Sequence, residues 1–144
     1  MIRYPHTLVN KQESIKDIVL TDYDVNSIEE SETAVVLVGP KGRELGDYLR
    51  KQGFRGDLIQ AIKLLPINED KATMFIKYKK VFVYDSYGTK NGFAEAIGAA
   101  LLDKGFKGEF KSFAIPNTYV QHATIAEQEK EFGLDIETVS KEIL

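Results

Sequence analysis

Apolar and polar residues along the chain form segments that predict strands and helices in alternation. The run TAVVLVG, residues 33–39, is continuously apolar but too short for a buried helix, which is typical of a central parallel strand covered on both faces. Alternating or apolar runs predict three further strands, at residues 57–66, 80–86 and 109–116.

Helical patterns follow these strands. They predict helices at residues 43–52, at a segment with Asn68 as its candidate N-cap, and at residues 93–104. The first and third of these helices end at Gly53 and Gly105, and each glycine is followed by phenylalanine. A glycine can take the left-handed conformation there, and the apolar residue after it can contact a leucine one turn back, which predicts a Schellman-type stop.

The tail of the chain contains two short predicted helices. Thr124 and Glu127 fit a capping box for the first, and Asp135 is a candidate N-cap for the second. Gly133 repeats the glycine stop between them, although Glu129 occupies the position where the other two helices have leucine.

This alternation predicts a three-layer α/β/α domain with a mostly parallel sheet of about five strands and right-handed crossovers. With 144 residues, the chain has the length of one domain. We expect the domain itself at residues 31–144. Residues 1–30 are expected to be a lead-in or linker segment, with one short β-like segment at residues 17–21.

The composition is that of an ordinary globular protein, with 43% hydrophobic and 28% charged residues. A net charge of −3 and scattered basic residues give no field that would attract nucleic acid. The absence of cysteine excludes disulfides and thiolate metal sites, and the chain has neither a long apolar run nor a signal-peptide pattern. We therefore expect a cytoplasmic protein with no nucleic-acid or membrane partner.

The turn GPKG, residues 39–42, joins the first predicted strand to the first predicted helix. Backbone N–H groups around Gly39, Lys41 and Gly42 can hold an anion at a helix N-terminus. The turn lacks the spacing of either glycine-rich nucleotide-binding motif, however. Glycine and proline also suit a strand-to-helix turn by conformation alone, and we favour this explanation.

Lys90 and Asn91 follow the third predicted strand, on the side where open α/β sheets place their ligands. Either side chain can contact an anion or a partner subunit, but Asn91 with Gly92 is also typical of a turn that opens a helix, which we favour. His122 has a side chain suited to general base catalysis. No partner residue accompanies it at a triad spacing, and we expect it to fix the start of the helix at Thr124.

No set of residues forms a catalytic or metal-binding motif. The only other histidine, His6, lies at the far end of the chain, so a two-histidine metal site is not supported. The acidic residues of the tail offer no carboxylate pair with distinct environments and have the pattern of a solvated helix face; they are Glu127, Glu129, Glu131 and Asp135. We predict no catalytic residue and no metal site in this chain.

Several motifs, in order along the chain, resemble the C-terminal domain of 1-deoxy-D-xylulose-5-phosphate synthases, which are transketolase-like enzymes. The motifs are LLPINEDK (64–71), KKVFVYDSYGTKNGFAEAIGAAL (79–101) and IPNTYVQHATIAEQEKEFGLDIETVSKEI (115–143). Their most specific part is the combination of Pro116, His122 and Gly133-Leu134-Asp135. The segment IRYPH, residues 2–6, also looks like the end of that family's middle domain, so the resemblance covers essentially the whole chain.

The resemblance implies that the complete enzyme joins a two-carbon unit from pyruvate to glyceraldehyde 3-phosphate in isoprenoid precursor synthesis. The resemblance also implies that the complete enzyme uses thiamine diphosphate and Mg²⁺, held by the two domains that precede this one. This chain is then expected to be inactive alone and to support a homodimer or contact the thiamine-binding domains. Arg3 matches an arginine near the substrate phosphate. His6 replaces a second arginine, and an imidazole cannot supply the bidentate fork of a guanidinium.

Two other hypotheses remain open. The C-terminal domain of a 2-oxo-acid dehydrogenase β subunit shares the fold and has a similar tail. The second alternative is a stand-alone regulatory or oligomerisation module that binds a small anion at residues 39–42.

Overall fold

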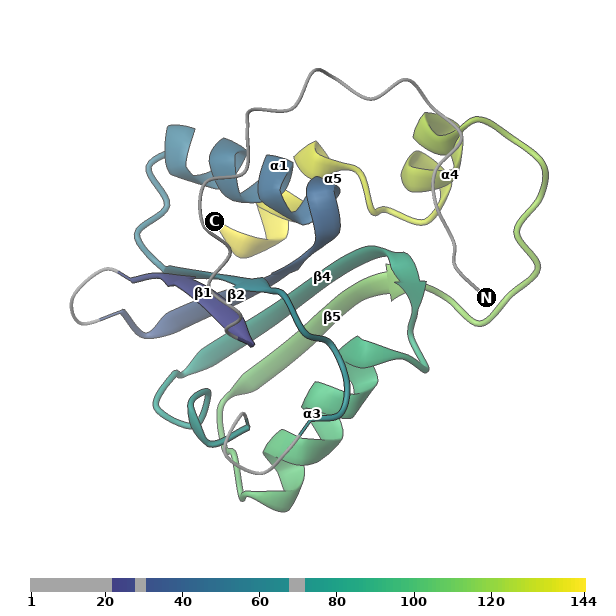
Figure 1. Ribbon diagram of the computed structural model, residues 1–144. Coiled ribbons are helices and arrows are strands. Elements are labelled where there is room, and N and C mark those ends of the chain that lie inside the picture. Colours follow the sequence, from purple (N-terminus) through teal and green to yellow (C-terminus); the bar gives the residue numbers. More distant parts are fainter. Residues whose placement is uncertain (1–21, 28–30, 68–71) are drawn as a thin grey trace.

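The computed structural model describes residues 22–27, 31–67 and 72–144. These residues form an α/β domain in three layers, in which a central sheet has α1 and α5 on one face and α3 on the other (Figure 1). Within these ranges no helix has the length and apolar character needed to cross a membrane. Four of the predictions lie outside the described residues: those for Arg3, His6, residues 17–21 and the Asn68 N-cap.

The sheet has five strands in the order β1-β3-β2-β4-β5. Every adjacent pair is parallel except β1 with β3, so the prediction of a mostly parallel sheet is confirmed. The sequence pattern predicts no strand at β1, which lies within the segment expected to be a lead-in. The strands are β1 (Tyr23–Asn26), β2 (Thr33–Val38), β3 (Asp57–Ala61), β4 (Lys80–Thr89) and β5 (Glu109–Ile115).

The helices of the described part lie where the sequence predicts them. Helix α1 begins at Gly39 rather than Arg43, because Pro40 fits the first turn, where its missing N–H removes no helical hydrogen bond. The helices are α1 (Gly39–Lys51), α3 (Phe93–Asp103), α4 (Ile125–Glu131) and α5 (Ile136–Ile143).

Three helices end in the predicted glycine stop. Gly53, Gly105 and Gly133 have φ angles of +83°, +74° and +63°. After α4, the Leu134 N–H donates to the Glu129 carbonyl at 2.7 Å and the Gly133 N–H donates to the Lys130 carbonyl at 3.3 Å, which is the hydrogen-bond pair of a Schellman motif. The same pair of bonds ends α1 and α3. The stop therefore forms at Gly133 even though a glutamate occupies the leucine position.

Two apolar cores fill the space between the layers. On one face, Val36 and Val83 of the central strands pack with Ile97 and Leu101 of α3. On the other face, alternate residues of the same strands pack with α1 and α5; they include Val35, Phe82, Leu45, Leu49, Val139 and Ile143. Because β2 and the first half of β4 are covered on both faces, residues 34–38 and 81–84 are continuously apolar, which is the pattern seen in the sequence.

Candidate functional site at the carboxyl edge of the sheet

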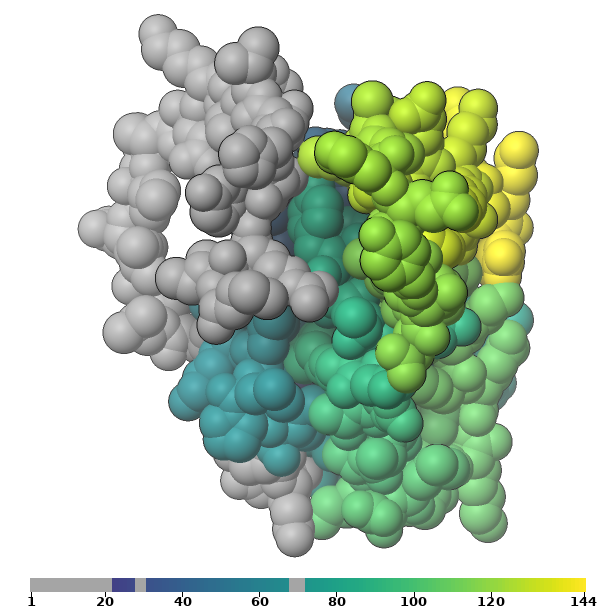
Figure 2. Space-filling view, turned by 90° about the vertical axis from the view of Figure 1, so that its right-hand side faces the viewer, coloured from purple at the N-terminus to yellow at the C-terminus, as the bar shows by residue number. Residues whose placement is uncertain are grey.

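The direction of the chain reverses between β2 and β4. From β2 the chain passes through α1 to β3, and from β4 it passes through α3 to β5, with α1 and α3 on opposite faces of the sheet (Figure 1). The carboxyl ends of β2 and β4 therefore form a topological switch point, the position where open α/β sheets bind their ligands. Figure 2 looks onto this edge, where the yellow-green segment after β5 borders the green residues of β4.

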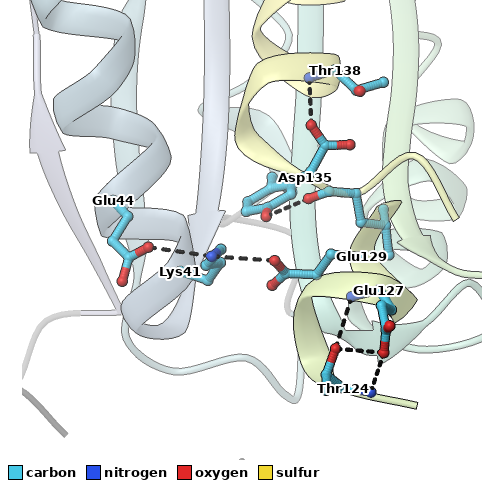
Figure 3. Close-up of polar contacts among 9 residues, drawn as sticks. Lys41, Glu44, Thr124, Glu127, Glu129, Asp135 and Thr138 are labelled. Carbon is cyan, nitrogen blue, oxygen red and sulfur yellow. Dashed lines mark hydrogen bonds and ion pairs between the residues drawn. The ribbon is translucent and has the colours of Figure 1, made fainter. Parts of the chain in front are cut away.

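The α1 side of the switch point is occupied by a side chain from α4. The Nζ atom of Lys41, in the first turn of α1, lies 3.2 Å from Glu129 Oε2 and 3.4 Å from Glu44 Oε2 (Figure 3). Glu129 is 8% exposed. A glutamate is tolerated at this depth because Lys41 compensates its charge. The helix start that is able to receive an external anion therefore already faces two carboxylates of the same chain.

The structure explains why glycine occupies both positions 39 and 42 of the turn between β2 and α1. Gly39 has a φ of +66°, which L side chains rarely adopt. Gly42 is buried against β2, and a Cβ atom there would lie 3.0 Å from the carbonyl carbon of Leu37. The sequence GPKG is thus accounted for by the close approach of α1 to β2, without a ligand.

The charged residues around Lys41 shift the pKa values of Lys41 and of the nearby Tyr87. Burial acts to lower the pKa of Lys41, but the carboxylates of Glu129 and Glu44 outweigh it and the pKa is raised. Burial and the negative charge of Glu129 raise the pKa of Tyr87, while Lys41 opposes the rise. Lys41 is therefore protonated and Tyr87 is a neutral phenol at neutral pH, so neither is ready to act as a general base.

Asp85 lies at the end of the regular part of β4 and forms a turn. Its Oδ1 atom accepts a hydrogen bond from the Gly88 N–H at 2.9 Å. Burial raises the pKa of Asp85, and the backbone N–H groups of Gly88 and Tyr87 oppose the rise. The pairing of β4 with β5 is irregular between Asp85 and Thr89. The carboxyl group of Asp85 thus holds this β-bulge.

The other candidate contact residues lie away from the α1 side. Lys90 and Asn91 are exposed and precede α3, on the other face of the sheet. The Gly92 N–H donates to the Thr89 carbonyl at 2.9 Å and Gly92 is the N-cap of α3, so the predicted helix-opening turn is present. His122 is exposed in the segment between β5 and α4.

The interpretation of the acidic tail residues as a solvated face is wrong for Glu129. Ile125 and Phe132 are half-buried four residues before and three residues after it, so they share its face of the helix. This spacing is the signal that places Glu129 inward. Glu127 is exposed and completes the predicted capping box, accepting from the Thr124 N–H at 2.9 Å.

A family model described as the C-terminal domain of transketolase matches residues 43–139 of this chain. The match begins within α1 and ends within α5. It therefore includes β3, β4, β5 and the α4 segment that carries Glu129.

Curated proteins that are similar to this chain include 1-deoxy-D-xylulose-5-phosphate synthases. The synthase of Rhodococcus erythropolis is 25% identical over 151 residues, which cover 99% of this chain and 23% of that protein. The synthase of Azobacteroides pseudotrichonymphae is 30% identical over 117 residues, covering 78% and 18%. Synthase 2 of Streptomyces coelicolor is 26% identical over 110 residues, covering 76% and 17%. The chain thus spans less than a quarter of the length of these relatives.

A solved structure described as a split-gene transketolase, an inactive beta4 tetramer, has a similar fold. The TM-score is 0.66 at 14% sequence identity, over 87% of this chain and 41% of that chain. At this identity the likeness concerns the fold alone, and it confirms the predicted three-layer α/β class.

Proposed function

The chain belongs to the family of transketolase C-terminal domains, and we propose that it is the C-terminal, non-catalytic domain of an enzyme resembling 1-deoxy-D-xylulose-5-phosphate synthase. In this role it supports dimerisation and contacts the domains that bind thiamine diphosphate. The observation that carries the proposal is the coverage of the relatives. Similarity to the Rhodococcus erythropolis synthase extends over 99% of this chain but only 23% of that protein, so the chain matches one part of that synthase, as the proposal requires.

The residues at the switch point support a non-catalytic role. A diphosphate at the start of α1 would meet the carboxylates of Glu129 and Glu44, which already neutralise Lys41. The described residues include no group of three or more histidine, cysteine, aspartate or glutamate side chains placed to hold a metal ion. The repulsion between a diphosphate and the carboxylates of Glu129 and Glu44 makes this edge of the sheet a poor site for thiamine diphosphate. We therefore assign the cofactor to the other domains.

A chimeric enzyme tests the proposal. The matching residues of the Rhodococcus erythropolis synthase are replaced by this chain, and the truncated synthase without those residues is the control. We expect the chimera to be a dimer by light scattering and to form 1-deoxy-D-xylulose 5-phosphate from pyruvate and glyceraldehyde 3-phosphate. The truncated control should do neither. A chimera that resists proteolysis but remains monomeric and inactive would contradict the proposal.

Two further experiments test the alternatives. If the domain serves a 2-oxo-acid dehydrogenase β subunit, a chimera with that subunit will regain activity and the synthase chimera will not. If it is an anion-binding module, calorimetry of the chain with phosphate will detect binding that is lost in Lys41→Met. The pairing of Lys41 with Glu129 at 3.2 Å makes us expect no such binding while α4 is in place.

A further inference from the structure

Helix α4 buries little apolar surface of its own: Ile125 is half-buried and no apolar residue of the helix is fully buried. Among its seven residues, Glu129 alone is buried, and this side chain pairs with Lys41 at 3.2 Å. A helix of this length is not stable alone, and helices in proteins ordinarily gain stability by packing an apolar face on the core. The position of α4 therefore depends on one ion pair and on the residues at its two ends.

The two ends of α4 differ in how firmly they are fixed. At the C-terminal end, Phe132 packs against the core and Leu134 is 3% exposed. At the N-terminal end, Ile125 is only half-buried, and the capping box joins Thr124 to Glu127 (Figure 3), within the same segment. The next contact, from Gln128 Nε2 to the Gln121 carbonyl at 3.0 Å, also stays within that segment. The N-terminal end of α4 is therefore less firmly fixed than the C-terminal end.

Within the part of the chain that the structure describes, only one of the two carboxylate oxygens of Glu129 has a partner, in the ion pair with Lys41. Glu129 Oε1 is buried and has no hydrogen-bond partner among the described residues. Desolvation of the two charges offsets much of their attraction, and an unsatisfied buried oxygen adds to that loss. The ion pair thus adds little net stability to the position of α4.

We propose that residues 116–131 form a strap over the α1 side of the switch point, closed by the Lys41–Glu129 ion pair and hinged at its C-terminal end, where Phe132 stays packed on the core. Opening of the strap separates Lys41 from Glu129 and exposes the first turn of α1. The strap therefore controls whether Lys41 is available at the carboxyl edge of the sheet. This property belongs to the chain itself and does not depend on which enzyme the domain serves.

Hydrogen exchange on the whole chain tests the strap. Glu129→Gln removes the charge but keeps the size of the side chain, and Glu131→Gln makes the same change at an exposed position of the same helix. In Glu129→Gln we expect the amides of residues 128–132 to exchange about tenfold faster or more, as loss of one partner of a buried pair requires. The amides of β4 should keep their native rates, and Glu131→Gln should match the native protein throughout.

Swapping the two charged residues gives a second test, again read out by hydrogen exchange. Lys41→Glu and Glu129→Lys should each accelerate exchange in α4, and the double variant should restore protection because the pair is re-formed in reverse. Equal exchange in Glu129→Gln and Glu131→Gln would overturn the proposal. Equal acceleration in α4 and β4, or failure of Glu129→Gln to fold, would also overturn it, because the pair would then hold the whole fold and not a movable strap.

Discussion

The hydroxyl group of Tyr84 donates a hydrogen bond of 2.7 Å to the carbonyl oxygen of Leu134, across 50 residues of sequence. Tyr84 belongs to the central strand β4, and Leu134 lies between α4 and α5, so this bond ties the C-terminal helices to the sheet. Burial raises the pKa of Tyr84, and the neighbouring Ser86 hydroxyl only partly opposes the rise. The phenol therefore remains a hydrogen-bond donor at neutral pH.

Replacement of Tyr84 by phenylalanine should destabilise the domain. The Leu134 carbonyl would be left buried without its donor, and we expect the free energy of unfolding to fall by about 1–3 kcal/mol. Urea denaturation measures this change. Tyr119→Phe removes the same hydroxyl group from a residue that is 88% exposed, and it should change the free energy by less than about 0.5 kcal/mol. Equal effects of the two substitutions would show that the bond to Leu134 contributes nothing.

The parts of the fold that depend on neighbours within one turn were predictable from the sequence. The glycine stops and the Thr124 capping box are of this kind, because all of their hydrogen bonds join residues at most five apart. Strand β1 was not predictable in this way. Its sequence YDVN has no clear strand pattern, and it is a strand because Tyr23 pairs with Ala61 in β3.

The candidate site was predictable only in part. The β2–α1 turn was identified from its glycines and its place after a strand. Its polar partner Glu129 was not, because Lys41 and Glu129 meet only when α4 folds back over the carboxyl edge of the sheet. The face shared by Ile125, Glu129 and Phe132 indicates burial of this glutamate, but no local pattern identifies the lysine that neutralises it.

The turn from α3 to β5 contains a glycine that no other residue can replace without a shift of the backbone. A Cβ atom at Gly108 would lie 2.4 Å from the carbonyl oxygen of Lys79. That oxygen accepts the 2.8 Å hydrogen bond of the Glu109 N–H, at the point where β5 begins to pair with β4. The turn from α1 to β3 has the sequence GFRG (53–56), which matches GFKG (105–108) except for arginine in place of lysine, and Gly56 corresponds to Gly108.

Gly108→Ala should therefore lower the free energy of unfolding by about 1–3 kcal/mol, the usual range for overpacking. Thermal and urea unfolding of the purified chain measure the change. Lys107→Ala alters the adjacent exposed residue and should stay within about 0.5 kcal/mol of the native protein. If both variants unfold at the same urea concentration, the backbone at residue 108 moves freely and the close approach to Lys79 is not a constraint.

Asp85 should make stability depend on pH. Burial raises its folded-state pKa above the ordinary value of 3.8, so between these two values the folded protein keeps a proton that the unfolded chain releases. The stability that Asp85 contributes is complete below this window and is lost as pH rises through it. Asp85→Asn cannot titrate there. The free energy of unfolding of the native protein minus that of the variant should therefore decrease as pH rises through the window.

Urea unfolding of both proteins at a series of pH values measures this difference. Above the folded-state pKa of Asp85 the difference should become constant, because the carboxyl group is then ionised in both states. A difference that increases with pH would mean that the hydrogen bonds from Gly88 and Tyr87 outweigh burial, and the sign of the shift would be reversed.

The N-cap of α5 allows a test of how the last helix contributes to the core. Asp135 Oδ1 accepts a hydrogen bond of 3.0 Å from the Thr138 N–H, and α5 supplies Val139 and Ile143 to the core that it shares with α1. Asp135→Ala should lower the free energy of unfolding by about 0.5–2 kcal/mol, the usual effect of losing an N-cap. Asp135→Asn keeps an oxygen acceptor and should retain most of this stability in urea unfolding. If the two variants lose the same amount, the charge of Asp135 and not its hydrogen bond fixes the start of α5, because only the charge is missing from both.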